Sequence, residues 1–191
     1  MKKNFGLIVV FILMSVLLSA VSVFAQQITP TPTGKDVLVV YFSATGTTER
    51  LAEKIAEITD ADLYEILAAE EYTSADLNWN DRNSRTTLEQ NDRSFRTEIG
   101  SDPVNLEGYS TIYIGYPIWW GEAPRIMDTF VESYDFDEIT MIPFCTSSSS
   151  GLGRSGKILE ENAESGKWLE GRRFGGNVSE DDLRSWIKSL Q

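Results

Sequence analysis

The stretch VLVVYFSATGTTER, residues 37–50, decides the fold class of this chain. Its first six residues are apolar throughout, which is typical of a strand buried on both faces of a parallel sheet. A short turn then leads into TTERLAEKIAEIT, in which Leu51, Ile55 and Ile58 recur at spacings of four and three. That spacing predicts a helix with one face against a sheet. The stretch therefore predicts a strand, a turn and a covering helix.

The rest of the chain repeats this alternation of strand-like and helix-like segments. The last helix is expected to begin at Ser179, because three acidic residues follow this good capping residue. Repeated strand and helix units indicate an α/β domain with a parallel sheet. Strands are expected at 37–42, 63–66, 111–116, 139–145 and 167–169, and helices at 47–59, 123–134, 156–164 and 179–190.

The N-terminus has a different character. Lys2 and Lys3 precede an unbroken run of apolar and small residues that ends in Val23-Phe24-Ala25. This pattern predicts a secretory signal peptide at residues 1–25, and hence a secreted or periplasmic protein. The run also approaches the roughly 20 residues that span a bilayer, so an uncleaved membrane anchor is the alternative.

One domain is expected after this leader. Residues 26–35 alternate proline with threonine and predict an extended linker, and residues 36–191 are long enough for a single core of ordinary size. The chain has 17 basic and 29 acidic residues, and removing the leader's two lysines takes the formal net charge from −12 to −14. Such a surface repels nucleic acid and anionic lipid. We therefore expect no nucleic-acid partner, and membrane contact only through an uncleaved leader.

The composition also excludes some chemistry. The chain has no histidine, so a Ser-His-Asp triad is impossible. Cys145 is the single cysteine, so the domain cannot form an internal disulfide.

Three loops follow expected strands, and parallel sheets bind ligands at that edge. The first, Ser43 to Thr48, combines four hydroxyl side chains with the free N–H groups of a helix start, which suits a phosphate monoester. It lacks the lysine of a nucleoside-triphosphate loop and the three glycines of a dinucleotide loop. The alternative is structural, with Thr47 capping the helix and Gly46 making the turn.

The second loop, GYPIWWGEAP at residues 115–124, carries Trp119 and Trp120 side by side between two prolines. Adjacent side chains cannot both point into one core, so at least one indole is expected to stack on a flat ring system. Alternatively, both indoles lie on the protein's own loops. The third loop, TSSSSGLG at residues 146–153, offers many backbone donors, although by itself it could be a flexible linker.

FSATGTT, GYPIWWGEAP and PFCTSSSSGLG, in this order, resemble the three FMN-contacting loops of the flavodoxin-like family. The resemblance covers residues 37–190. It implies a doubly wound, five-stranded parallel sheet in the order 2-1-3-4-5, with helices on both faces.

The resemblance also implies a set of FMN-binding residues, with no metal site and no catalytic side chain. The phosphate would contact Ser43, Ala44, Thr45, Gly46, Thr47 and Thr48; the isoalloxazine ring would contact Pro117, Ile118, Trp119, Trp120 and Gly121; and its pyrimidine edge would contact Thr146, Ser147, Ser148, Ser149, Ser150 and Gly151.

The implied function is FMN-dependent electron transfer outside the cytoplasm, to a redox partner protein or a small electron acceptor. An FMN-dependent reductase of quinones or nitroaromatics is one alternative. A binding module with this fold but no flavin is another, because a fold alone does not fix function.

A long segment, residues 69–108, separates the second and third expected strands. It contains Arg82, Arg85, Arg93 and Arg96, two pairs spaced by three. The arginines either form a basic cover near the flavin for an anionic substrate or partner, or pair with Glu89, Asp92 and Glu98 on the surface.

Overall fold

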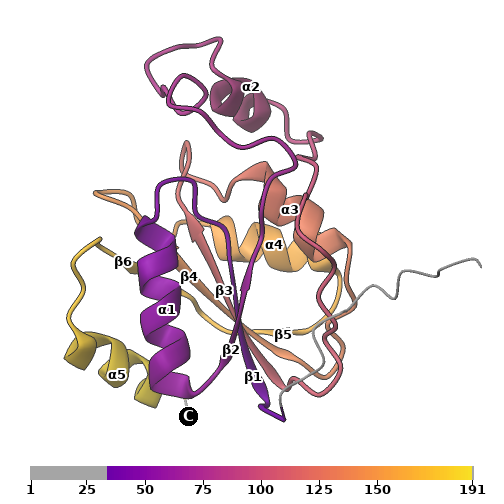
Figure 1. Cartoon of the computed structure of the whole chain (residues 1–191), viewed down its shortest axis with the longest axis vertical. Helices are drawn as coiled ribbons and strands as arrows, with labels where there is room; N and C mark the ends of the chain where they lie inside the picture. The colour runs from indigo at the N-terminus through magenta and orange to yellow at the C-terminus, as the bar shows by residue number, and fades with distance from the viewer. Residues whose placement is uncertain (1–33, 191) are drawn as a thin grey trace, which may run out of the picture.

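The computed structural model describes residues 34–190, which form a parallel sheet with helices on both faces (Figure 1). The strand order β2-β1-β3-β4-β5 confirms the expected doubly wound topology. The strands are β1 (Val37–Tyr41), β2 (Asp62–Glu65), β3 (Thr111–Pro117), β4 (Thr140–Thr146), β5 (Lys167–Trp168) and β6 (Arg172–Phe174).

The edge of the sheet beside β4 differs from the expected single strand. Both β5 and β6 pair with β4 in parallel, with Met141 opposite Trp168 and Phe144 opposite Arg172. Between them, Gly171 passes so close to the Pro143 carbonyl oxygen that a Cβ atom there would lie 2.4 Å from it. Proline also has no N–H to donate. The pairing is therefore interrupted at Pro143, and the edge strand is split in two.

Two helices cover each face of the sheet. Helices α1 (Thr47–Thr59) and α5 (Glu180–Ser189) lie on one face, and α3 (Arg125–Glu132) and α4 (Ser155–Ala163) on the other (Figure 1). The side chains of β1 alternate between the two cores, since Val39 and Tyr41 belong to the α1–α5 core and Leu38 and Val40 to the α3–α4 core. This alternation explains why every residue after Val37 in β1 is apolar and buried.

A further short helix, α2 (Arg85–Asn91), lies in the long segment between β2 and β3. Figure 1 shows it beyond the carboxyl ends of the strands, apart from the two helical layers. We call residues 69–108 the insertion. Its position brings it to the edge of the sheet where the loops after β1, β3 and β4 converge.

The proposed signal peptide at 1–25 and most of the proposed linker at 26–35 lie outside the described residues. Within residues 34–190, no helix combines the length and the apolar character needed to cross a membrane.

Cys145 lies in the middle of the sheet, fully buried in β4. Burial raises the pKa of its thiol to about 12, with a smaller opposing effect of Arg173. Because the thiolate is the reactive form, we expect no labelling of the native protein by a disulfide reagent at pH 8. One thiol per chain should react after unfolding in guanidinium, and rapid labelling of the native protein would contradict the burial.

Candidate functional site

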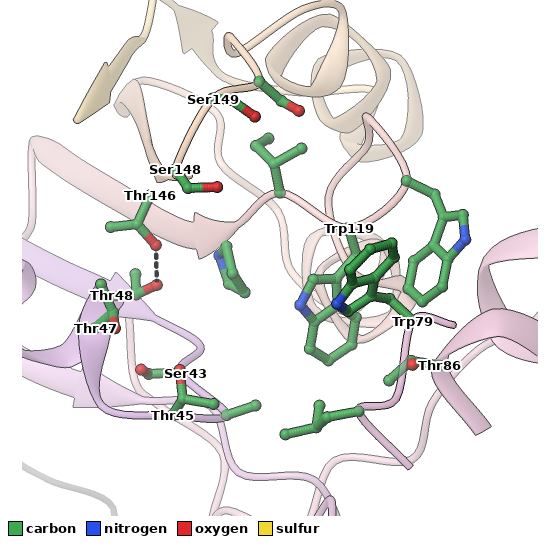
Figure 2. A pocket seen from close by; sticks show the side chains of 16 residues that line it. Ser43, Thr45, Thr47, Thr48, Trp79, Thr86, Trp119, Thr146, Ser148 and Ser149 are labelled. Atoms are coloured by element: carbon green, nitrogen blue, oxygen red, sulfur yellow. Dashed lines mark hydrogen bonds between the residues drawn. The ribbon is translucent and has the colours of Figure 1, made fainter. Parts of the chain in front are cut away.

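A cavity of about 630 Å³ opens at the carboxyl ends of the strands. Figure 2 shows hydroxyl side chains at one end and indole rings at the other. Thirteen of the residues expected to bind a ligand line it: Ser43, Ala44, Thr45, Thr47, Thr48, Pro117, Ile118, Trp119, Trp120, Thr146, Ser148, Ser149 and Ser150. Three residues of the insertion, which were not expected, complete the lining: Leu77, Trp79 and Thr86.

The loop after β1 leaves the start of α1 open to the cavity. Gly46 is the N-cap residue, with φ of 75°, and no side chain caps the helix. Thr47 is the first helical residue, so the interpretation of Thr47 as the cap is wrong. The first-turn N–H groups and the helix dipole therefore favour an anion beside Thr47 and Thr48.

The first turn of α1 is joined to the end of β4 by a buried hydrogen bond of 2.8 Å between the hydroxyls of Thr48 and Thr146. Next to it, the Arg50 guanidinium donates to the Thr47 hydroxyl at 3.3 Å. Arg50 does not itself line the cavity, but this hydrogen bond places its positive charge beside a loop whose own side chains are neutral. The sequence could have predicted this contact, because residues three apart on a helix are neighbours and Arg50 follows Thr47 by three.

The loop after β3 ends in a two-residue turn. Trp119 and Glu122 exchange two backbone hydrogen bonds of 3.0 Å, and the residues between them, Trp120 and Gly121, have φ of 49° and 82°. Positive φ at both central residues is typical of a type I′ turn, which suits glycine far better than tryptophan. The turn holds the Trp120 indole outward with 44% of its surface exposed.

The Trp119 indole takes a different direction. It packs edge-on against Phe42 and Tyr72, with ring centroids 5.6 and 5.3 Å apart. The two adjacent indoles therefore diverge, as expected, while both line the cavity. Two of the expected FMN-binding residues, Gly46 and Gly121, are not among the residues that line this cavity in the described part of the chain.

Hydrogen bonds hold the start of the loop after β4. The Ser147 hydroxyl donates to the Ser150 carbonyl at 2.6 Å, and its backbone N–H donates to Phe174 of β6 at 3.2 Å. Arg173 also donates to the Ser147 carbonyl. These bonds turn Ser147 away from the cavity, which Ser148, Ser149 and Ser150 line; within the described chain, Ser147 and Gly151 are not part of that lining.

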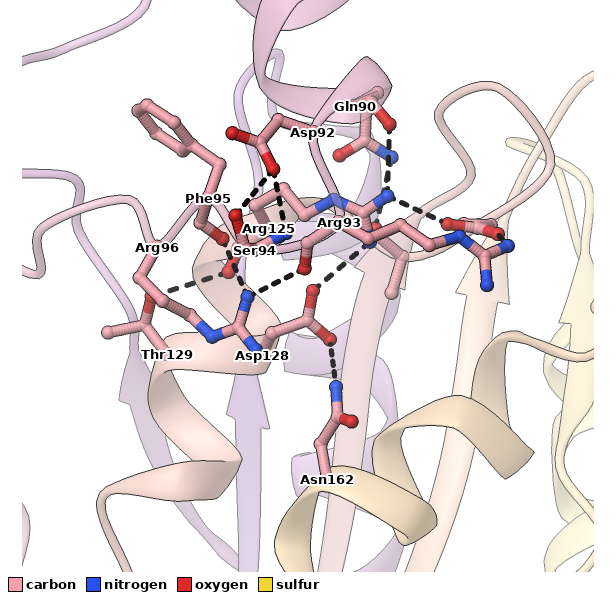
Figure 3. Close-up of polar contacts among 12 residues, drawn as sticks. Gln90, Asp92, Arg93, Ser94, Phe95, Arg96, Arg125, Asp128, Thr129 and Asn162 are labelled. Atoms are coloured by element: carbon pink, nitrogen blue, oxygen red, sulfur yellow. Dashed lines mark hydrogen bonds and ion pairs between the residues drawn. The ribbon is translucent and has the colours of Figure 1, made fainter.

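The insertion is attached to the loop after β3 by buried polar groups. Gln90 on α2 donates to the carbonyls of Trp119 and Ala123, both at 3.1 Å. In return, Arg125 on α3 donates to the Gln90 carbonyl at 3.0 Å (Figure 3). Arg125 is only 3% exposed and also pairs with Asp128 at 3.2 Å and Glu122 at 2.9 Å. Burial raises the pKa of Asp128, and Arg125 partly offsets this effect.

The arginines of the insertion do not form one basic stripe. Arg85 pairs with Glu89 at 2.7 Å, as expected, and stacks over Tyr72. Arg93 and Arg96 instead reach Glu122 and Glu132, outside the insertion. The expected pairing with Asp92 is wrong, because this carboxylate accepts hydrogen bonds from Ser94.

The fold and the cavity define an α/β protein that binds its ligand at the carboxyl edge of a doubly wound sheet. The family model described as Flavodoxin matches residues 36–190, and the chain belongs to this family. The resemblance seen in the three loops is thereby confirmed.

Solved structures agree with this assignment. A protein designated a flavoprotein from Bacteroides uniformis ATCC 8492 is 47% identical, with a TM-score of 0.77 over 81% of this chain and 99% of that chain. One from Bacteroides eggerthii DSM 20697 is 43% identical, with a TM-score of 0.76 over 81% and 97%. A flavoprotein from Lactobacillus acidophilus NCFM, solved in complex with FMN, is 24% identical, with a TM-score of 0.60 over 80% and 99%. No match was found among curated protein sequences.

Proposed function

We propose that this chain binds FMN and transfers electrons outside the cytoplasm. The observation that carries the proposal is the cavity itself, which has hydroxyls and the uncapped start of α1 at one end and indoles at the other. A phosphate monoester joined to a flat aromatic ring matches both ends. Membership of the flavodoxin family and the FMN complex of the Lactobacillus acidophilus protein support this choice.

The residues at the two ends of the cavity fit the two parts of FMN, its phosphate and its ring. The uncapped start of α1, with Thr47 and Thr48, would hold the phosphate, and the neighbouring Arg50 would add a positive charge. The loop after β3 would flank the ring with Trp119 and Trp120, and the loop from Ser148 to Ser150 would approach its polar edge. FMN, when bound, supplies the electron-transfer chemistry, and the chain's part is to bind and orient it.

The visible spectrum of the purified protein during stepwise reduction tests this function. A flavin spectrum that changes with each added electron is the expected result. Protein that is colourless, and stays without flavin after incubation with excess FMN, would exclude an FMN-dependent function and favour the binding module without flavin.

The indoles are expected to contribute measurably to FMN affinity. Stacking is worth about 0.5–1.5 kcal/mol beyond area burial, so replacing the stacked indole in Trp119→Ala or Trp120→Ala should raise the FMN Kd by at least about twofold to tenfold. Flavin fluorescence titration measures this, and far-UV circular dichroism should show an unchanged fold. Leu63→Ala removes an exposed apolar side chain of β2 and should leave the Kd unchanged. Unchanged affinity in both tryptophan variants would refute the stacking.

A reductase of quinones or nitroaromatics is the second candidate. It is favoured by Leu77, which adds apolar surface to the cavity beyond the three loops. Multiple turnovers with a quinone and a defined electron donor would favour the reductase. One-electron exchange confined to a protein partner would favour the electron carrier.

The extracytoplasmic location rests on residues 1–25, whose sequence predicts a signal peptide. Mass spectrometry of the protein recovered from outside the cytoplasm tests it. A chain beginning just after Ala25 is expected, whereas a full-length chain in the membrane fraction would indicate an uncleaved anchor.

A further inference from the structure

Trp79 is the most exposed large apolar side chain of the described residues, at 74%. It lies in the insertion, yet it lines the same cavity as Trp119 and Trp120. Figure 2 shows the Trp79 and Trp119 indoles on the same side of the cavity, across from the hydroxyls of Thr47 and Thr48. Trp79 and Trp120 are both exposed and line the same cavity, and apolar side chains gathered at one cavity mark a ligand-binding site in a way that a single exposed side chain does not.

The backbone around Trp79 is fixed in place by hydrogen bonds. The Asp81 N–H donates to the Asn78 carbonyl at 3.0 Å and closes a turn with Trp79 inside it. Hydroxyls of α2 hold the segment at two points, because Thr86 donates to the Asp76 carbonyl at 2.6 Å and Thr87 to the Asp81 carbonyl at 2.9 Å. The exposed indole is therefore presented on a defined backbone.

Helix α2 also contacts the backbone of the turn that holds Trp119 and Trp120. Gln90, three residues after Thr87, holds the carbonyls of Trp119 and Ala123. Trp79 and the Trp119–Trp120 turn thus belong to one hydrogen-bonded assembly, although 40 positions separate Trp79 from Trp119 in the sequence. Such an assembly presents aromatic side chains without the entropy loss of ordering a mobile loop on binding.

We infer that Trp79 is a cofactor-binding residue, and that the insertion supplies a further aromatic wall for the flat ring of FMN. This inference rests on the proposed FMN binding and adds a contact from outside the three loops. Trp79 contacts the ring and not the phosphate, since the phosphate-binding groups lie at the opposite end of the cavity. Because FMN and riboflavin share the ring, Trp79 contributes equally to the affinity for both ligands.

The experiment compares FMN and riboflavin titrations of the full domain, followed by flavin fluorescence. Trp79→Ala should raise the Kd of both ligands by about tenfold, a factor equivalent to about 1.4 kcal/mol, and Trp79→Phe should restore most of the affinity. Thr47→Val, at the phosphate end, should weaken FMN and leave riboflavin unchanged. Phe95→Ala is the matched control, because Phe95 is the insertion's other exposed aromatic residue, 41% exposed, and does not line this cavity.

Two results would overturn the inference. Unchanged affinities in Trp79→Ala would show that this indole does not contact the flavin ring. A loss confined to FMN would place Trp79 at the phosphate. Both are distinct from failure of the proposed function, in which the wild-type protein itself binds neither ligand.

Discussion

Replacing Arg125 by methionine is expected to destabilise the protein by about 3–5 kcal/mol, which is the usual cost of removing one partner from a buried ion pair. The change leaves the buried Asp128 without its cation and removes the donor to the Gln90 carbonyl. Since domains of this size are stable by only about 5–15 kcal/mol, the loss is a large part of the total. Urea denaturation with circular dichroism detection measures it.

The control for Arg125→Met is Arg184→Met. Arg184 pairs with Glu180 on α5, but both side chains are more than half exposed, so the loss should stay below about 1 kcal/mol. The double variant Arg125→Met/Asp128→Asn should recover part of the stability, because it removes the buried charge and keeps an acceptor for Asn162. Equal losses of stability in Arg125→Met and Arg184→Met would show that the buried pair with Asp128 contributes no more to stability than the exposed pair with Glu180.

Gly115→Ala is expected to destabilise the protein by about 3 kcal/mol through overpacking. A Cβ atom at this position in β3 would lie 2.1 Å from the Phe144 ring on the neighbouring strand β4. Neither can move easily, because both residues are buried and their strands are paired in register. Thermal and urea unfolding measure the effect.

Two further variants isolate the cause. The double variant Gly115→Ala/Phe144→Leu should lose less stability than the sum of the losses in the two single variants, because the smaller leucine side chain leaves room for the added Cβ atom. Gly175→Ala, where a Cβ atom would meet nothing within 4 Å, should change stability by no more than about 0.5 kcal/mol. A destabilisation in Gly175→Ala equal to that in Gly115→Ala would contradict the steric explanation.

Local patterns in the sequence predicted most of the fold. The apolar run of β1 and the period of α1 come from burial against a sheet, and the structure has α1 at residues 47–59, as expected. The sheet order came from the resemblance carried by three loops. Strand β6 was missed because RRF is short and mostly polar, and its pairing depends on the interruption at Pro143.

The insertion could not be predicted in the same way. The buried residues of α2 are Thr86, Thr87, Glu89 and Gln90, which show no apolar period, because hydrogen bonds and not apolar packing hold this helix. For the same reason, the contribution of Leu77, Trp79 and Thr86 to the cavity was not visible. Their contacts depend on the distant position of the Trp119–Trp120 turn.

The split edge strand affects how molecules of this protein meet one another. An unpaired strand edge can accept a strand from another chain, and long, flat, apolar edges are the most prone to do so. Here one edge consists of a two-residue and a three-residue segment, the second beginning with Arg172 and Arg173. The opposite edge, β2, has four residues and carries an acid at each end. Both edges are therefore poor templates for strand addition, and this sheet should resist growth into fibrous aggregates when the protein is concentrated.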